Sequence, residues 1–465
     1  MRRTLIAVTS VAALLIGYGT ADAYDRVPGV LTIDEEATRQ APQASATVPV
    51  LPAASTEAPA PTRAGLTAAL EEDAKAKALG ERVGVVVRDA LTGETLYSHG
   101  GDRPITPAST AKLLTAAAVA QTADLSRVMT TQVVAGDRPD ELVLVASGDT
   151  MLARGEGDPT AVGGRAGLAD LARQVAASIP AKGEGSYSLR LDMTYAHGER
   201  YPPTWEMADV AAGYTQGVTM IGLAGERPKP FEPSPEFPER SVLKAFAKEL
   251  RAVGVAVEAD TSTKQWQTPA PEEAEVLGAV DSAPLGDVLA VALDDSDNAL
   301  TENVARQVAA VHGVGTSTAA VSDWVQQTLA GAGIDLTGVT LKDSSGLSSG
   351  QKVPARVISD VMQLGITGSA QEMTSILAEL PVAGLTGTLH ERFDTDDSRS
   401  AAGLARAKTG TLTGTSALAG TTTTADGRLL TYVLLADRVP STTGTLGARA
   451  VLDRMVADLT DCGCR

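Results

Sequence analysis

The pattern of apolar and polar residues predicts ordered structure from about residue 65 onward. Residues 66–79 carry apolar side chains at helical spacing, and the run 83–87 that follows is typical of a buried strand. A turn at 91–93 and a second predicted strand at 94–97 complete a predicted hairpin. The ordered part therefore begins with a helix and two antiparallel strands.

The C-terminal part predicts more strands. Three β runs lie at 404–409, 415–424 and 428–436, and Asp426-Gly427 favours a two-residue hairpin between the last two. A helix over 446–459 would cover the sheet. These elements predict an α/β (α+β) domain in which an antiparallel sheet is flanked by helices.

Residues 108–122 are apolar on almost every side. A helix without a polar face is typically a buried central helix. Thr106 is placed to cap its first turn, and Pro107 to occupy its first position. We expect this helix to lie at the centre of the domain.

The stretch 129–280 differs in texture from its flanks. It combines short predicted strands, at 141–146 and 187–192, with amphipathic helices and a proline-dense loop at 228–233. A chain of 465 residues also exceeds what one ordinary core accommodates. We interpret the stretch as one or more inserted domains that divide a single domain into two parts, residues 65–128 and 281–465.

The N-terminus predicts export. Arg2 and Arg3 precede an apolar run at 5–16, and Ala21-Asp22-Ala23 matches a signal peptidase site. The run is short for a membrane span, which favours a cleaved signal peptide, residues 1–23, over a retained anchor. Residues 24–64 form a linker rich in proline, alanine and threonine. The folded part is expected in the cell envelope, periplasmic or on the cell-wall side, with membrane contact only if the signal segment is retained.

Charge and metal-ligand patterns exclude two classes of function. The 57 acidic and 39 basic residues give a formal charge of −18, which repels nucleic acid. The four histidines form no metal-ligand pattern, so we expect no metal or cofactor. The acidic loop 394–397 is expected to be solvated rather than to bind calcium. Cys462 and Cys464 cannot staple the fold, their ring would be strained if oxidised, and their role stays open.

The first candidate site opens the apolar helix. Ser109 and Lys112 are three residues apart, so they share a helix face and the amine can reach the hydroxyl. An apolar setting lowers the pKa of a lysine, which frees the amine to accept the serine proton. A Ser-x-x-Lys tetrapeptide is common, but a lysine in so apolar a helix has no ordinary structural role. The pair predicts a nucleophile and its base.

A second motif, Ser296-Asp297-Asn298, precedes another predicted helix. Its hydroxyl and carboxamide can bind a substrate and the catalytic lysine. The alternative is an ordinary helix cap, since serine, aspartate and asparagine are all preferred there.

A third motif, Lys408-Thr409-Gly410-Thr411, lies at the end of a predicted strand. The lysine supplies a cation for an anionic group, and the hydroxyls can bind a carboxylate. Gly410 is expected to let a substrate lie close to the strand edge.

The three motifs in this order are the set described for penicillin-binding proteins and serine β-lactamases. The chain resembles in particular the class C, type-4 low-molecular-mass penicillin-binding proteins, which are D-alanyl-D-alanine carboxypeptidases and endopeptidases. The resemblance extends from about residue 65 to the C-terminus and is carried by residues 107–112, 146–149, 294–298, 343–348, 380–384 and 407–411. It implies a penicillin-binding transpeptidase/β-lactamase-like domain with additional domains inserted between the first two motifs.

The resemblance also implies a reaction on peptidoglycan stem peptides. Ser109 would be acylated by the penultimate D-alanine, with Lys112 as general base and Ser296 relaying the proton to the leaving D-alanine. Backbone N–H groups of Ser109 and Thr411 would form the oxyanion hole. The terminal carboxylate would be held by Lys408, Thr409 and Thr411, and the peptide carbonyl by Asn298. β-Lactams would acylate the same serine.

The chain departs from this family at two places. Several relatives follow Ser-Gly-Leu-Ser with an arginine that binds the diaminopimelate carboxylate, whereas this chain has Ser349, with Gln351 and Lys352 close by. Residues 214–217 match poorly. Side-chain specificity, and the balance between carboxypeptidase and endopeptidase activity, stay open.

Three alternatives remain. Residues 346–350 match a Gly-x-Ser-x-Gly nucleophile elbow at Ser348, with Asp360 and His390 in the order of an α/β-hydrolase triad, although Pro354 places the next helix start too late. A serine β-lactamase or esterase on the same fold would need a second carboxylate for deacylation. A catalytically inactive wall-binding scaffold would not need the polar groups that all three motifs retain.

Overall fold

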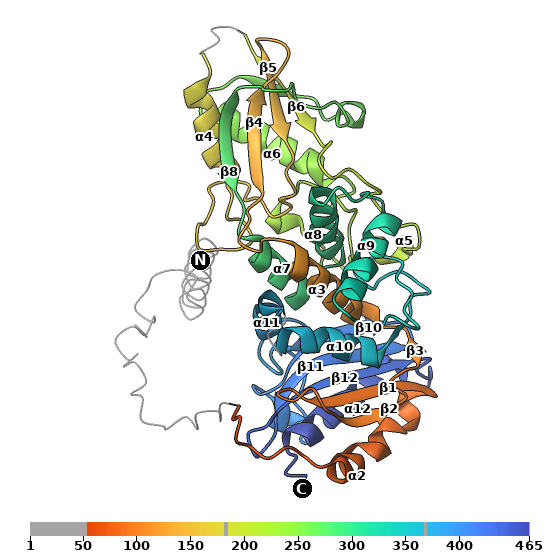
Figure 1. Ribbon diagram of the computed structural model, residues 1–465. Helices are drawn as coiled ribbons and strands as arrows, with labels where there is room; N and C mark the ends of the chain where they lie inside the picture. Colours follow the sequence, from red (N-terminus) through yellow and green to blue (C-terminus); the bar gives the residue numbers. More distant parts are fainter. Residues whose placement is uncertain (1–53, 181–184, 367–369, 465) are drawn as a thin grey trace, which may run out of the picture. The chain divides into compact units, whose positions relative to one another are not determined.

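The computed structural model describes residues 54–180, 185–366 and 370–464 (Figure 1). The predicted signal peptide and most of the linker lie outside these residues. No helix within them is long and apolar enough to cross a membrane. The last linker residues contact the folded part, because Arg428 Nη1 donates to the carbonyl oxygens of Thr56 and Ala58, each at 3.1 Å.

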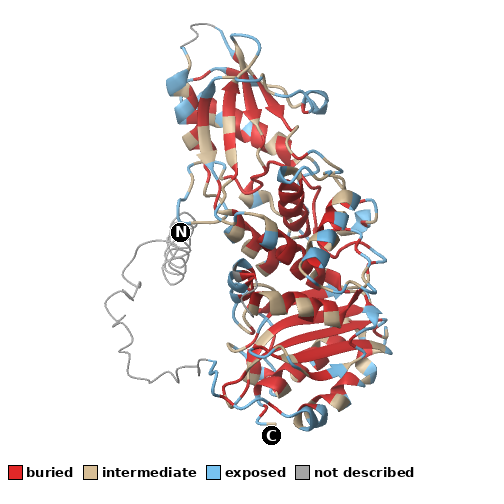
Figure 2. Ribbon diagram, viewed as in Figure 1, coloured by how far each residue is buried: buried red, intermediate tan, exposed pale blue. Residues whose placement is uncertain are grey.

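The first sheet joins the beginning and the end of the folded chain. Its five antiparallel strands lie in the order β10-β11-β12-β1-β2. Their bounds are β1 (Arg82–Asp89), β2 (Thr95–His99), β10 (Arg406–Leu412), β11 (Thr415–Thr423) and β12 (Leu429–Asp437). The predicted antiparallel sheet is confirmed. β1, β11 and β12 are buried on both faces, as the almost continuous apolar runs of β1 and β12 predict (Figure 2).

Helices cover both faces of this sheet. On one face, α2 (Arg63–Ala74) and α12 (Gly444–Thr460) share a core with Tyr432 of β12. On the other face, α10 (Ala355–Ile366) shares a core with Val433. Alternate residues of β12 thus serve two cores, because successive strand side chains point to opposite faces.

The apolar helix predicted from the sequence is α3 (Lys112–Thr122). Every residue from Lys112 to Ala120 is buried, which confirms it as a central helix. It is surrounded by α8 (Asn298–Val311), α9 (Thr318–Gly331), α10 and α11 (Gln371–Ala378), and α7 (Leu285–Asp294) completes the same core.

A second five-stranded sheet has its own core. Its order is β7-β6-β5-β4-β8, with parallel pairing among β5, β6 and β7 and antiparallel pairing elsewhere. α4 and α6 pack against it. The bounds are β4 (Thr130–Ala135), β5 (Glu141–Val145), α4 (Leu168–Ser178), β6 (Tyr187–Asp192), α6 (Pro238–Ala252), β7 (Val257–Ala259) and β8 (Val276–Asp281). These strands fall within the stretch whose sequence texture differs from its flanks.

The remaining elements are short. α5 (Met207–Ala211) is one turn, and β3 (Pro104–Ile105) pairs with β9 (Val353–Pro354) beside the start of α3. Cys462 and Cys464 form a disulfide. The segment containing it contacts the start of α2, because the N–H and hydroxyl of Thr62 donate to the Cys464 carbonyl at 2.7 and 3.2 Å.

Two predicted details of the C-terminal sheet are wrong. The connection between β11 and β12 spans residues 424–428, and the hydrogen bond from Thr424 N to Arg428 O at 2.9 Å leaves three residues, 425–427, in the loop that it closes. Gly427 adopts a φ of 87°, the left-handed conformation that such a loop needs at its last position. β10 also continues to Leu412, so the third motif lies within the strand rather than at its end.

Candidate active site

Ser109 lies on a 3-10 turn, Ala108–Ala111, that leads directly into α3. The predicted cap by Thr106 is wrong, because its hydroxyl and its N–H bind Asp437 Oδ2 instead, at 3.0 and 2.9 Å. The first hydrogen bond of the turn runs from Thr110 N to Pro107 O. The N–H of Ser109 precedes that bond, so the turn leaves it free to bind another acceptor.

Lys112 makes the central contacts of the site. Its side chain is completely buried, and its Nζ lies 3.0 Å from Ser109 Oγ, 2.6 Å from Asn298 Oδ1 and 2.8 Å from the carbonyl oxygen of Ser345. Burial lowers the pKa of Lys112 to about 8, although nearby acidic side chains, Asp343 first among them, act in the opposite direction. An amine with this pKa can act as a base near neutral pH.

The second motif provides both a helix cap and a contact with Lys112. Asp297 caps α8, accepting from Leu300 N at 2.9 Å, and also accepts from the Arg227 guanidinium, with Nη2 at 2.6 Å. Asn298 instead points to Lys112 and donates through Nδ2 to Tyr214 O at 2.8 Å. The cap of α8 and the contact with Lys112 thus fall on adjacent residues.

Ser296 is not bonded to Lys112. It has a φ of 57°, and its hydroxyl has no hydrogen-bond partner within the described part of the chain. The structure therefore brings Ser109, Lys112 and Asn298 together directly, while the proton relay through Ser296 stays a prediction.

The third motif lies on β10, an edge strand of the first sheet. Ala407 N donates outward to Pro381 O at 3.0 Å. Because backbone groups alternate along a strand, the N–H groups of Thr409 and Thr411 face the same open edge. Thr411 itself is exposed. This edge can bind a substrate backbone and place the Thr411 N–H beside Ser109.

Lys408 is as deeply buried as Lys112. Its Nζ donates to Thr409 O at 3.1 Å. Burial and the charge of Lys112 lower its pKa well below the usual range for lysine. A substrate carboxylate would compensate this buried cation. Thr409 Oγ1 donates to Thr388 Oγ1 at 2.9 Å, so that hydroxyl already has a partner.

Gly410 has a different role from the expected one. A Cβ at this position would lie 2.8 Å from Pro107 O and 3.2 Å from Ala108 Cβ. The glycine therefore lets β10 approach the turn that carries Ser109, and the side on which a side chain would stand is not open to substrate.

Sequence reasoning missed the role of Asp343. This buried carboxylate accepts hydrogen bonds from five donors: Trp205 Nε1, Ser345 N, Gly346 N, Ser348 N and Gln351 Nε2, at 2.7 to 3.0 Å. It thus fixes the loop whose Ser345 carbonyl accepts from Lys112. The loop belonged to a segment that carried the family resemblance, but nothing in its pattern marked the aspartate as its organiser.

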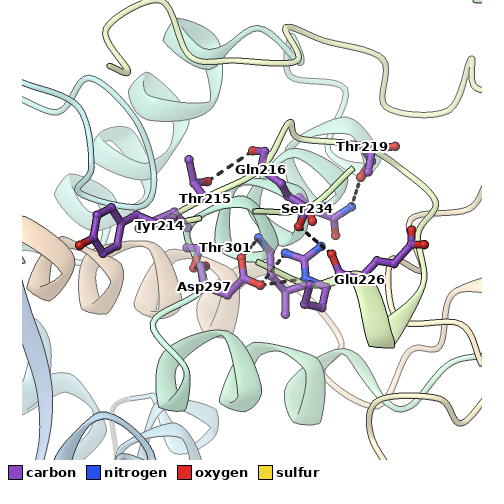
Figure 3. Close-up of polar contacts among 12 residues, drawn as sticks. Tyr214, Thr215, Gln216, Thr219, Glu226, Ser234, Asp297 and Thr301 are labelled. Atoms are coloured by element: carbon purple, nitrogen blue, oxygen red, sulfur yellow. Dashed lines mark hydrogen bonds and ion pairs between the residues drawn. The ribbon is translucent and has the colours of Figure 1, made fainter. Parts of the chain in front are cut away.

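The sequence also gave no role to residues 214–217. Figure 3 shows this segment beside the start of α8, where Asp297 and Thr301 lie. Thr215 and Gln216 are buried, and Tyr214 contributes the carbonyl that binds Asn298. The contact uses a backbone atom, which explains why no side-chain pattern signalled it.

The nucleophile-elbow alternative is wrong. Ser348 is completely buried in the loop held by Asp343, and α10 begins only at Ala355. Asp360 forms ion pairs with Arg88 and Arg356 instead of orienting a histidine.

The residues close to Ser349, where several relatives are expected to have an arginine, are hydrogen-bonded to other parts of the chain. Gln351 donates to Asp343 Oδ1, and Lys352 Nζ donates to Thr106 Oγ1 and Asp437 Oδ2, both at 2.8 Å. Ser349 N donates to Thr204 O at 3.4 Å. Neither Gln351 nor Lys352 can replace the arginine without breaking these contacts.

A buried lysine bonded to a serine and an asparagine, beside an open strand edge, defines a serine hydrolase of the penicillin-binding type. A profile of the D-Ala-D-Ala carboxypeptidase 3 (S13) family matches residues 66–227 and 224–459. The chain belongs to this family.

Relatives agree with this assignment over most of their length. Carboxypeptidase DacB of Mycolicibacterium smegmatis is 35% identical, with 99% of this chain and 95% of the relative covered. D-alanyl-D-alanine carboxypeptidase of Actinomadura sp. (strain R39) is 31% identical, with 77% and 78% covered. The crystal structure of penicillin binding protein 4 from Haemophilus influenzae has the same fold, with a TM-score of 0.66, 18% identity, and 85% and 98% of the chains covered.

Proposed function

We propose that this chain is a serine D-alanyl-D-alanine carboxypeptidase that removes the terminal D-alanine from peptidoglycan stem peptides. The observation that carries the proposal is the set of three contacts made by the buried Lys112 Nζ, with Ser109, Asn298 and Ser345. Family membership supplies the substrate class, and the relatives are carboxypeptidases by name.

Acylation would begin with attack of Ser109 Oγ on the penultimate D-alanine carbonyl, with its proton passing to Lys112. The N–H groups of Ser109 and Thr411 would bind the developing oxyanion, and one such donor is worth about 3 kcal/mol of barrier. Ser296 would relay the proton to the departing D-alanine nitrogen. Water would then hydrolyse the ester on Ser109, with Lys112 again as base.

Substrate would add to the edge of β10. Lys408, with Thr409 and Thr411, would hold the terminal carboxylate, and Gly410 keeps this strand close to Ser109. Asn298 would bind the peptide carbonyl through the N–H of its amide that Tyr214 O does not occupy. No step of this proposed reaction needs a metal or a cofactor.

We also propose that the protein is exported and acts in the cell envelope. Residues 1–23 would be its signal peptide and 24–64 its linker. The catalytic domain would comprise 65–128 and 281–465, with 129–280 inserted. The family's wall substrate supports an envelope location, and the separate core around the second sheet supports the insertion.

A fluorescent penicillin tests the proposal directly. Wild-type protein should be labelled, and Ser109→Ala should not. Ser348→Ala serves as the matched control, because that serine is buried in the loop next to the site, and it should still be labelled. Labelling that survives Ser109→Ala would overturn the nucleophile, and a label that is lost rapidly would indicate a β-lactamase.

Activity is tested on peptides. D-Alanine should be released from a pentapeptide that ends in D-alanyl-D-alanine, and the same enzyme with a cross-linked dimer measures endopeptidase activity. Release from the dimer alone would contradict the carboxypeptidase assignment.

A further inference from the structure

A second buried carboxylate lies on α8, one turn after Asn298. Glu302 follows Asn298 by four residues, so the two side chains share one face of the helix. It is 2% exposed, and its Oε1 accepts a hydrogen bond from Ser344 N at 2.8 Å. Its charge also reaches Lys112, whose pKa an ionised Glu302 raises. The proposed reaction steps leave this carboxylate without a role.

The hydrogen bond between Ser344 and Glu302 closes a ring around the Lys112 amine. Two acceptors bind this amine, Asn298 Oδ1 at 2.6 Å and the Ser345 carbonyl at 2.8 Å. The first acceptor belongs to the helix that carries Glu302, and the second belongs to the residue after Ser344. Glu302 therefore connects the two acceptors, and the spacing between them depends on its hydrogen bond.

Ser344 is also held from the helix that carries Lys112. Thr115 follows Lys112 by three residues on α3, and its hydroxyl donates to Ser344 O at 2.6 Å. The N–H and the carbonyl of Ser344 are thus bonded to one side chain from each helix. Thr115, Ser344 and Glu302 are all buried, so water does not compete for these bonds. This attachment on two sides restrains the neighbouring Ser345 carbonyl.

Asp343 does not make this connection. Its donors come from residues 345–351 of its own loop and from Trp205, so it fixes the shape of the loop. Among the residues that the structure describes, Glu302 is the one residue of α8 that hydrogen-bonds residues 343–348. Without Glu302 the loop would keep its internal hydrogen bonds but would lose its hydrogen bond to α8.

The surroundings of Glu302 favour its neutral form. Burial and the charge of Asp343 raise the pKa of Glu302 to about 8, while Arg306, one turn later, acts in the opposite direction. A neutral carboxyl group keeps an oxygen that accepts from Ser344 N. Near neutral pH the residue can therefore hold the loop without adding a negative charge that would keep Lys112 protonated.

We infer that Glu302 is a positioning residue for the acylation step: by holding Ser344, it keeps the Lys112 amine in place against the nucleophile. Within the described residues it hydrogen-bonds neither Ser109 nor Lys112, and it acts through the two acceptors of the amine. The inference rests on the proposed function, because it takes Lys112 as the base that activates Ser109.

Stopped-flow acylation of the whole protein by a fluorescent penicillin tests the inference. Saturation separates the dissociation constant of the first complex from the rate constant of acylation. Glu302→Met removes the acceptor and keeps the size of the side chain, so the rate constant should fall roughly tenfold or more with an unchanged dissociation constant. Glu302→Gln keeps an acceptor and resembles the neutral acid, so its rate constant should stay within about threefold of wild type. Both variants lose the charge, so the difference between them isolates the hydrogen bond.

The matched control is Gln307→Met. Gln307 is a buried polar residue of the same helix, and its amide donates to Asn303 Oδ1 and Gly148 O rather than to the loop. Its acylation rate constant should equal that of wild type. If thermal melting shows that Glu302→Met does not fold, Glu302→Asp decides, because a side chain shorter by one methylene withdraws the carboxylate from Ser344 N and should slow acylation in the same way.

A wild-type rate constant in folded Glu302→Met overturns the inference, as do equal losses in Glu302→Met and Glu302→Gln. A lower melting temperature without a slower acylation step would mean that Glu302 serves folding alone, and it also overturns the inference. Failure of the proposed function appears separately, as absence of penicillin labelling in the wild type, and the inference then fails with it.

Discussion

At the scale of single residues, the number of partners of Lys112 Nζ bears directly on its protonation. A neutral amine has two N–H groups and one lone pair. Asn298 Oδ1 and the Ser345 carbonyl can only accept, so they take the two N–H groups. The lone pair then faces the Ser109 hydroxyl. The geometry therefore accommodates the neutral amine, which is the form that removes the serine proton, as well as the ammonium, which would donate to all three oxygens.

The first prediction concerns pH. Burial lowers the pKa of Lys112 from 10.5 to about 8, so the neutral fraction increases as the pH rises through 8. The second-order rate constant for acylation by a penicillin should rise about tenfold per pH unit below this value and level off above it. Lys112→Arg should be roughly 10³-fold slower and lack the rise. A flat wild-type profile between pH 6 and 9 contradicts the assignment.

The second prediction concerns Asp343, which we interpret as a positioning residue. Its negative charge raises the pKa of Lys112, so Asp343→Asn should move the midpoint of the acylation profile to lower pH. Losing a charged acceptor should also cost about 2 kcal/mol of folding free energy or more. Asp335→Asn, an exposed aspartate that accepts from Thr337 N at 2.9 Å, should change neither quantity. A purely structural role would lower the melting temperature without moving the midpoint.

Residue pairings explain where sequence reasoning reached its limit. Ser109 and Lys112 could be paired because they are three positions apart on a predicted helix. The donors to Asp343 come from residues 205 and 345–351, and Tyr214 acts through its carbonyl. Contacts of these two kinds depend on tertiary structure and leave no periodicity in the sequence.

At the scale of elements, the pattern of apolar and polar residues was sufficient to predict α3 and the strands of the first sheet. It was insufficient at the ends of strands, because the pairing of β10 with β11 extends the strand to Leu412, beyond the predicted end at Thr409. This extension of β10 determines how the residues of the third motif are oriented at the candidate site. Lys408 and Gly410 lie on the side of β10 that faces the turn carrying Ser109, while the N–H groups of Thr409 and Thr411 face the open edge.

The third prediction belongs to this strand. Gly410→Ala would place a Cβ 2.8 Å from Pro107 O, so β10 or the turn carrying Ser109 must move. Because a misplacement of about 1 Å can cost 10²-fold in rate, penicillin acylation should fall by roughly this factor. Gly331→Ala is the matched control: its Cβ would meet nothing within 4 Å, and acylation should not change. Equal rates in both variants would contradict the close approach.

At the scale of the whole molecule, residues of the stretch 129–280 contact two segments of the candidate site, the loop of Asp343 and the start of α8. Trp205 donates to Asp343, in the loop whose Ser345 carbonyl accepts from Lys112. Tyr214 O accepts from Asn298, and Arg227 forms an ion pair with Asp297, which caps α8. The proposed insertion therefore forms part of the wall of the site. A catalytic domain without it would lose partners for two buried polar side chains.

The fourth prediction measures this connection by a double-mutant cycle. Trp205→Phe removes the indole N–H that donates to Asp343 Oδ2 at 2.7 Å and keeps most of the ring volume. A hydrogen bond to a buried carboxylate is worth about 1.5–3 kcal/mol, so the acylation rate should fall by roughly tenfold if the loop loses its position. If the tryptophan acts through Asp343, adding Trp205→Phe to Asp343→Asn should lower the rate no further. Additive losses would mean that Trp205 supports the site by packing alone, and Trp324→Phe controls for the loss of a buried indole elsewhere.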